Sequence, residues 1–514
     1  MEPSKVSGGA ARLAVLLTCL YFAVESFFGL APAKASSTIC RAIVCLAAAY
    51  ACFTARFDYL TWACARRKVL ALFGVQFASW MLLVAVEFYS FEFSNFDTGI
   101  FANQVLCWKE TGRYYSSILG THAFADHFTP NLLLLAPLLS LWKSFLWFPI
   151  VKVLAWAWSV CLLALLSAEA LGRRSPYRWL VPGIYLVNPF VARTMLTEFQ
   201  PSSLAIPLVI LAFRYAFLER VTPLIITLFV LLGFKEHMAA VWISIGFFLA
   251  IEKKRAWLGG LLILAGSLEG LLVYRWLMPA FAGSAVHHDA RIRPLAFVAK
   301  KLWLLVQAVF SFAGLPLCLR YGFLYALPGF MLVLMGGEPV MASFGHHYHD
   351  VGFALLACCS ILGLRRLLEL EPFHPKRAQA VSAVISLVVL AMAYRFPAYY
   401  IRSEWPSREQ AAMHRDLNQL RQFVSSYQPQ EIWALDHLGP YLFDQPRLKS
   451  ILLPELPMGA PGEARKLVVV SNLVDLNPLS PEQYGLLLKN LSSKYREVGP
   501  EAGGGSGLRV FVSP

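Results

Sequence analysis

Charged residues are scarce in this chain. Only 15% of its 514 residues are Asp, Glu, Lys or Arg, whereas 58% are hydrophobic, and the mean hydropathy is +0.57. Soluble globular domains usually have about 25% charged residues. This shortage excludes an ordinary soluble multidomain protein and predicts a membrane protein.

Several site motifs are also missing. None of the ten cysteines forms a CxxC pair, and nine of them lie in or beside apolar runs, so neither a disulfide framework nor a zinc pair is predicted. There is no HExxH motif and no glycine-rich phosphate loop before a helix. The net charge of +14 comes from basic residues in short connections, where they orient helices, and we therefore expect no nucleic-acid partner.

Long apolar runs dominate the sequence. They approach or reach the roughly 20 residues that cross the hydrocarbon core as a helix. They lie near 12–31, 39–55, 69–89, 149–171, 178–192, 203–218, 222–234, 237–251, 256–278, 302–320, 322–336, 350–364 and 378–396. We predict an all-α polytopic membrane protein with about 11 to 14 transmembrane helices. Residues 1–68 are expected to form an N-terminal transmembrane hairpin whose first run is a retained signal anchor.

The first polar loop is residues 90–130. Basic residues at 56 and 66–68 place the preceding connection in the cytoplasm, so the loop is predicted to be extracytoplasmic. It contains Asp97, Asp126 and His127. Residues 99–108 are expected to form an amphipathic helix in the membrane interface, ended by Gly112. Asp97 is either a chemical group of the site or the N-cap of this helix, with Thr98 as the competing cap.

Three further polar segments interrupt the apolar runs: residues 198–203, 235–237 and 346–350. Ionisable side chains beside spans are costly, and they usually face a cavity or a partner. For Lys235-Glu236-His237 the alternative is a turn at the membrane surface with an internal ion pair. For 346–350 the alternative is a metal site, because His at positions i and i+3 share a helix face, although lining of a substrate cavity fits better.

The composition changes near residue 404. Helical periodicity over 408–427 is followed by strand patterns at 432–435, 450–453 and 466–470, a helix at 481–495 and a last strand at 508–512. Residues 404–514 are therefore predicted to be a small soluble α/β domain. An odd number of spans with the N-terminus inside would put this domain outside the cytoplasm.

The polar segments resemble the signature blocks of an uncharacterised prokaryotic family, the domain of unknown function 2079. The matching blocks are Phe96–Gln104, Asp126–Pro130 with 132–138, Glu198–Pro201 with 205–207, Lys235–His237, His346–Tyr348 and, in the soluble tail, Asp436–Leu442. The chain differs from the family where Glu198, Gln200 and His237 replace the usual Asp, His and Asp.

That family resembles the GT-C glycosyltransferases, which take a sugar from a polyprenyl-phosphate carrier. The resemblance implies a GT-C-like transmembrane domain over 69–400 in the bacterial inner membrane, with membrane lipid and a polyprenyl-phosphate sugar donor as partners. It also implies an acidic residue in the first external loop that acts as general base or orients the acceptor, and Asp97 matches. A divalent metal is left open as cofactor. The expected substrate-binding residues are Asp126, His127, Glu198, Lys235, Glu236, His237, His346, His347 and Tyr348.

Two other functions compete with this interpretation. A transporter or flippase would use polar residues such as Arg193, Glu198 and Lys235 as a substrate path, but we find no internal repeats that would favour it. A non-catalytic membrane scaffold would need neither Asp97 nor a cavity. Convergence of Asp97, His127, Lys235 and His346 on one site would favour the transferase.

Overall fold

The structure is a computed structural model. It describes residues 66–282, 293–342, 346–369, 401, 404–445, 447–451, 465–471, 479–498 and 508–513. The predicted N-terminal hairpin lies outside these residues except for its last three positions, and so does the apolar run at 378–396.

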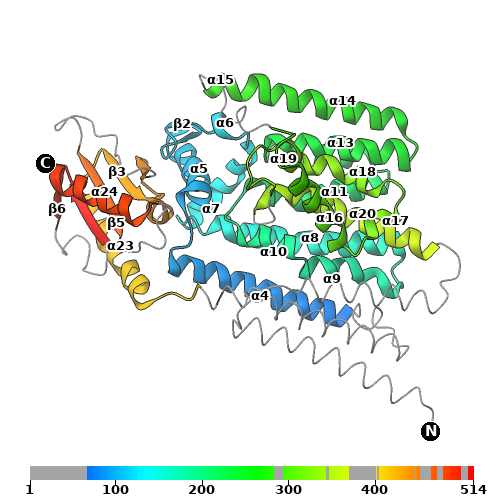
Figure 1. The fold of residues 1–514 in the computed structure, drawn as a ribbon, viewed down its shortest axis with the longest axis horizontal. Helices are drawn as coiled ribbons and strands as arrows, with labels where there is room; N and C mark the ends of the chain where they lie inside the picture. The colour runs from blue at the N-terminus through cyan, green and yellow to red at the C-terminus, as the bar shows by residue number, and fades with distance from the viewer. Residues whose placement is uncertain are drawn as a thin grey trace, which may run out of the picture.

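The first part of the described chain is a set of helices joined by short turns (Figure 1). Its elements are α4 (Arg66–Ser90), the π-helix η1 (Asn95–Gly99), α5 (Ile100–Thr111), β1 (Tyr115–Ser116), β2 (Thr121–His122), α6 (Ala123–Asp126), the 3₁₀ helix η2 (Pro130–Leu135), α7 (Ala136–Leu141), α8 (Trp147–Leu171), η3 (Pro176–Trp179), α9 (Leu180–Val187) and α10 (Pro189–Leu196).

The middle of the chain continues in the same way. Its elements are α11 (Pro201–Phe217), α12 (Val221–Leu232), η4 (Glu236–Met238), α13 (Ala239–Phe247), η5 (Phe248–Glu252), α14 (Ala256–Leu272), η6 (Val273–Leu277), α15 (Met278–Ala282), α16 (Val298–Ser311), α17 (Leu315–Cys318), α18 (Gly322–Ala326), η8 (Leu327–Phe330), α19 (Met331–Met335), η9 (His347–His349) and α20 (Asp350–Glu369).

Four helical segments of the described chain are long and apolar enough to cross a membrane. They are Arg66–Ser90, Trp147–Leu171, Ala256–Ala282 and His347–Glu369. Shorter apolar helices, such as Pro201–Phe217 and Val221–Leu232, pack among them. The predicted helical membrane protein is confirmed, while the number of spans stays a prediction.

Helix α20 forms the centre of the helical region and α14 its edge. In the most apolar 18-residue stretch of the segment that contains α20, 78% of the residues are buried, compared with 22% in that of the segment that contains α14. Glycines let neighbours approach α20: a Cβ on Gly363 would lie 2.0 Å from the carbonyl oxygen of Leu315. Figure 1 shows α14 along one side of the helical region, opposite α4. Because α14 exposes Trp257, Leu264 and other apolar side chains, we assign this side to lipid contact.

The helix expected in the interface, α5, is instead buried. Every residue from Ile100 to Cys107 is shielded, including the polar Asn103, whose Oδ1 accepts hydrogen bonds from the backbone and hydroxyl of Ser117 at 2.9 and 3.1 Å. Only its last turn, from Trp108, is exposed. Gly112 ends the helix in the left-handed conformation, as predicted. The prediction of an interfacial helix is wrong because protein, not lipid, covers its apolar arc.

The C-terminal α/β region contains a five-stranded sheet in the order β4-β3-β5-β7-β6. Its elements are α23 (Arg408–Tyr427), β3 (Glu431–Leu435), η10 (Asp436–Leu438), η11 (Pro440–Leu442), β4 (Leu448–Ile451), β5 (Lys466–Ser471), α24 (Pro481–Lys494), β6 (Arg496–Val498) and β7 (Leu508–Val512). Strand β3 pairs in parallel with β4 and β5, and β7 is antiparallel to β5 and β6. Both helices begin with a capping box. The predicted α/β tail is therefore observed, with β6 as a strand that the sequence pattern did not predict.

The contact between α13 and α14 depends on small residues. A Cβ on Gly259 would lie 2.5 Å from the carbonyl oxygen of Gly246, whereas Gly260 has nothing within 4 Å. We expect Gly259→Leu to destabilise the protein by about 1–3 kcal/mol, because overpacking forces the helices apart. Gly260→Leu is the matched control and should leave the melting temperature in detergent unchanged. Equal melting temperatures for the two variants would contradict this packing.

Candidate functional site

The polar segments of the sequence meet around η1, at one end of the helical region. The local fold of η1 comes from Ser94, whose hydroxyl accepts a hydrogen bond from the Phe96 N–H at 3.2 Å and caps the helix. The following helix, α5, has no side-chain cap. Asp97 is therefore not the N-cap that the alternative interpretation required, and its partly exposed carboxylate is available for other contacts.

Asp97 lies within the electrostatic reach of groups from several loops. Burial raises its pKa; Lys235, a hydrogen bond from the Gln200 side chain and His127 oppose this effect, while Asp126 adds to it. The charge of Asp97 in turn acts on Glu198, His346 and Asp436. The structure thus brings Asp97, His127, Lys235 and His346 together, from segments up to about 250 residues apart in sequence.

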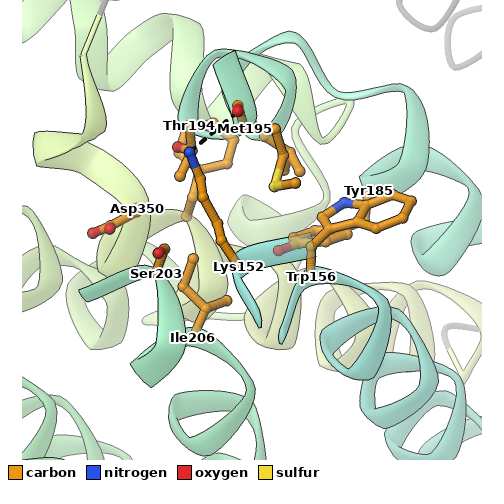
Figure 2. A pocket seen from close by; sticks show the side chains of 10 residues that line it. Lys152, Trp156, Tyr185, Thr194, Met195, Ser203, Ile206 and Asp350 are labelled. Carbon is orange, nitrogen blue, oxygen red and sulfur yellow. Dashed lines mark hydrogen bonds between the residues drawn. The ribbon is translucent and has the colours of Figure 1, made fainter. Parts of the chain in front are cut away.

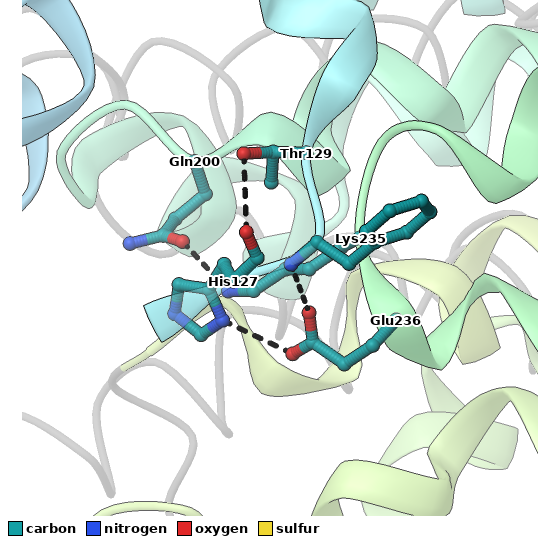
Figure 3. Close-up of polar contacts among 6 residues, drawn as sticks. His127, Thr129, Gln200, Lys235 and Glu236 are labelled. Atoms are coloured by element: carbon teal, nitrogen blue, oxygen red, sulfur yellow. Dashed lines mark hydrogen bonds and ion pairs between the residues drawn. The ribbon is translucent and has the colours of Figure 1, made fainter. Parts of the chain in front are cut away.

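The Lys235-Glu236-His237 segment is held by residues from other loops. Lys235 is only 4% exposed, and its Nζ donates to Oε1 of Gln200 at 3.0 Å. Glu236 contacts Nδ1 of His127 at 3.1 Å and accepts the Phe128 N–H at 3.3 Å (Figure 3). The alternative of a surface turn with only an internal ion pair is therefore wrong.

Glu236 is poised to stay ionised. Burial alone would raise its pKa, but the charge of His127 and its hydrogen bond, together with Lys235 and His237, outweigh burial and lower the pKa below its usual value. The ionised carboxylate fixes the His127 ring through Nδ1, and the ring of Phe101 stacks beside it with centroids 6.3 Å apart. His127 and Lys235 therefore supply two nitrogen donors close to Asp97.

Glu198 and Phe199, in the connection between α10 and α11, form hydrogen bonds with Thr98, the residue after Asp97. Oε2 of Glu198 accepts the Thr98 N–H at 3.1 Å, and the Phe199 N–H donates to Oγ1 of Thr98 at 3.3 Å. Burial and the nearby charge of Asp97 raise the pKa of Glu198 to about 8, although hydrogen bonds from Ser94 and Thr98 oppose the shift. Glu198 is therefore mainly protonated at neutral pH.

Lys152 is a site-supporting residue that the sequence reasoning missed. It reaches from α8 to the end of α10, where its Nζ donates to the carbonyl of Met195 at 3.1 Å (Figure 2). The same Nζ also donates to the carbonyls of Glu198 (3.3 Å) and Thr197. These bonds fix the backbone that carries Glu198. An isolated lysine inside the apolar run 149–171 is the signal that could have identified it. Gln200 bridges Lys235 and Asp97, and in the sequence it stands out only as a departure from the family pattern.

The histidine segment approaches the same site from α20. His346 is exposed as a residue, but partial desolvation of its ring lowers its pKa; Asp97 opposes this effect and Arg193 adds to it. His347 is 7% exposed and lies within the electrostatic influence of Lys235 and His237. Tyr348 packs on the His347 ring with centroids 4.5 Å apart. His237 is also buried, so it lines the interior of the site and not its surface.

The cavity beside Lys152 is too small to hold a sugar. It has a volume of about 20 Å³, which is room for roughly one water molecule. It lies between Lys152, Ser203 and Asp350, with Trp156 and Tyr185 on its apolar side (Figure 2). Asp350 accepts a hydrogen bond from Ser202 at 2.7 Å. This cavity is therefore an internal feature of the scaffold behind the site.

The described residues do not form a metal site. Within the described part of the chain, no group of three or more His, Cys, Asp or Glu side chains is arranged to hold a metal ion. The alternative of a metal site at 346–350 does not fit this geometry, since His349 contacts the Phe190 carbonyl at 3.4 Å and Asp350 contacts Ser202 and the Val351 N–H.

These features define a polytopic helical membrane protein with a charged site where its polar loops meet. The family model described as "Predicted membrane protein (DUF2079)" matches residues 87–293. This stretch contains Asp97, His127, Glu198 and Lys235, and the resemblance to that family is confirmed over it.

Two solved structures resemble the chain in overall shape. Both are crystal structures of ArnT from Cupriavidus metallidurans, one bound to undecaprenyl phosphate and one in the apo state. The first has a TM-score of 0.49 and 11% identity and covers 87% of this chain and 98% of that chain. The second has a TM-score of 0.48 and 12% identity, with 84% and 97% covered. No curated protein matches this chain by sequence.

The contact between His127 and Glu236 predicts a specific dependence of stability on pH. Because the folded-state pKa of Glu236 is lowered, its stabilisation is present above the unfolded value near 4.5 and is lost as pH falls below it. We expect Glu236→Gln to lower stability by about 3 kcal/mol at pH 7 and to flatten the loss below pH 4.5, as measured by thermal unfolding.

Glu110→Gln is the control for this variant, because it breaks an ion pair with Lys143 whose side chains are 44% and 33% exposed. It should cost less than about 1 kcal/mol. Similar losses for the two variants, or an unchanged acid limb in Glu236→Gln, would contradict the role assigned to Glu236.

Proposed function

We propose that the protein is a membrane glycosyltransferase that moves a sugar from a polyprenyl-phosphate-linked donor to an acceptor on the extracytoplasmic face of the bacterial inner membrane. One observation carries the proposal: the partly exposed side chain of Asp97 lies within electrostatic reach of two nitrogen donors, the buried ammonium of Lys235 from another loop and the half-buried ring of His127 from the far end of its own loop. Transfer from a lipid phosphate needs this combination, because the acceptor loses a proton while the departing lipid phosphate gains a further negative charge.

Asp97 is the proposed general base. Its carboxylate accepts the proton of the acceptor hydroxyl as that oxygen bonds to the anomeric carbon of the sugar. The bond from the anomeric carbon to the phosphate oxygen breaks, and its electron pair leaves with the lipid phosphate. Burial raises the pKa of Asp97 toward the range where a carboxylate accepts protons effectively, while Lys235 and Gln200 keep enough of it ionised.

Lys235 and His127 are the proposed binders of the lipid phosphate. An ammonium has three donors, and Gln200 takes one of those of Lys235. The ring of His127 is fixed by Glu236, and the charges of both His127 and Lys235 act on Asp97. Preorganised donors of this kind stabilise charge that develops in the transition state without having to reorient. His346, His347 and Tyr348 are proposed to line the donor side of the site.

Glu198 has a structural place in this scheme. Its largely protonated side chain leaves Asp97 as the ionised member of the neighbouring pair, because two close carboxyl groups do not both ionise at neutral pH. The residue thereby tunes Asp97 and anchors the amide of Thr98. Asp126 and Glu236 add negative charge near Lys235 and His127. His237 fills the buried side of the Lys235–His237 segment.

The direct test is transfer by Asp97→Asn. The purified protein in proteoliposomes would be given a panel of polyprenyl-phosphate sugars, and release of the lipid phosphate would be measured. We expect Asp97→Asn to lose at least about 100-fold in kcat, since the amide cannot accept the proton. Glu110→Gln, an acid-to-amide change in an exposed ion pair of the same loop, should keep native activity. Full transfer by Asp97→Asn would overturn the proposal, and movement of intact donor across the vesicle would favour a flippase.

The pH profile gives a second test. Lys235 lowers the pKa of Asp97, so its removal raises that pKa. Because a base must be ionised to act, the acid limb of kcat/KM should move to higher pH in Lys235→Met, while KM for the donor rises. Lys143→Met, at the exposed pair with Glu110, is the control and should leave the limb in place. An acid limb that stays put or moves to lower pH would contradict the coupling between Lys235 and Asp97.

A further inference from the structure

The C-terminal α/β region docks directly on the loop that carries Asp97. The docking edge is the carboxyl end of β3, the edge at which parallel sheets commonly present functional groups. Here Oδ1 of Asp436 accepts the Asn95 N–H at 3.1 Å. The Ser94 hydroxyl and the Phe96 N–H also lie beside the Asp436 carboxylate. A residue of the C-terminal region thus binds the first residue of η1, two residues before Asp97.

A close contact beside this hydrogen bond requires glycine. The side chain of Asn95 is 1% exposed and lies between Gly99 of its own helix and Gly439 of the C-terminal region. A Cβ on Gly439 would lie 1.8 Å from Oδ1 of Asn95, and a Cβ on Gly99 would lie 2.6 Å from the same atom. The Asn95 side chain is therefore packed tightly between Gly99 and Gly439, and any larger residue at 439 would displace it.

The C-terminal region also binds the end of α4, from which the loop starts. The hydroxyl of Tyr441 donates to the Phe88 carbonyl at 2.6 Å, and Nε2 of Gln410 donates to the Ser90 carbonyl at 2.6 Å. These carbonyls belong to the last turn of α4, and the carbonyl groups at the end of an α-helix have no N–H donor within the helix. His414 packs on the ring of Phe91, with centroids 4.4 Å apart. The chain from 88 to 96 is thus fixed at both ends by the C-terminal region.

We propose that the C-terminal α/β region is a working part of the site, in which Asp436 and Gly439 act as positioning residues that set the place of the Asp97 carboxylate. The proposal rests on the function proposed above for Asp97. Asp436 holds the backbone of Asn95, two residues before Asp97, and has no direct part in the transfer. Positioning of this kind has large effects, because a shift of about 1 Å at a reacting group can cost about 100-fold in rate.

The test compares Asp436→Ala with Asp436→Asn in the full-length protein in lipid nanodiscs. Asn keeps a side-chain oxygen that can accept the Asn95 N–H, and Ala does not. Hydrogen exchange of the peptide around residues 91–101 reports on the loop without any assay of transfer. Glu497→Ala is the control, since it removes a carboxylate from an exposed ion pair with Arg509 on β6 and β7.

For Asp436→Ala we expect faster exchange of the loop amides and a fall in kcat of about 100-fold, with little change in KM for the donor. Asp436→Asn should restore both the protection and most of the rate, and Glu497→Ala should match the native protein. Gly439→Ala should reproduce the effects of Asp436→Ala through displacement of Asn95.

Unchanged exchange in both Asp436→Ala and Gly439→Ala would overturn the proposal. Faster exchange with native kcat would also overturn it, because the contact would then hold the loop without positioning Asp97. A native protein that transfers no sugar would overturn the proposed function instead, and the exchange comparison would still decide whether the C-terminal region holds the loop.

Discussion

The burial of the Lys235 ammonium is the constraint on which the site depends. A buried charge costs several kcal/mol unless nearby groups compensate it. The compensation comes from three separate segments: Gln200 accepts a hydrogen bond, and Asp97 and Glu236 supply negative charge. Two of these groups are in turn held by other residues, Glu236 by His127 and the Asp97 loop by Glu198. The loops therefore fold together around one cation, and this explains why residues distant in sequence converge.

The same charges determine which of the two neighbouring carboxyl groups, Glu198 or Asp97, is ionised. Glu198 and Asp97 are close enough to raise each other's cost of ionisation, and burial adds to it. The protein keeps one of them largely neutral and the other partly exposed. Lys152 supports this arrangement from behind, because it fixes the carbonyls that precede and include Glu198. Oε2 of Glu198 in turn accepts the Thr98 N–H, so this side chain links the α10–α11 connection to the residue after Asp97.

Sequence patterns predicted the parts of this structure that follow from desolvation. Polar residues among apolar runs had to meet partners, and Asp97, His127, Lys235 and His346 do so. The burial of α5 could not be predicted in this way, because lipid and protein interior are equally apolar and hydropathy does not distinguish them. The contact of Asn95 with Gly439 joins residues far apart in sequence, and no local pattern records such an approach. Lys152 was visible as a lone charge in a span, but its targets are backbone carbonyls, which any sequence supplies.

The C-terminal α/β region and the first polar loop lie on the same side of the protein, since Asp436, Tyr441 and Gln410 all bond to residues 88–95. The most direct test of the account is a cryo-EM structure with a polyprenyl-phosphate sugar bound. The account predicts phosphate oxygens within hydrogen-bonding distance of Lys235 Nζ and the His127 ring, with the Asp97 carboxylate facing the anomeric carbon. A phosphate bound away from Lys235, with Asp97 directed away from the sugar, would contradict it.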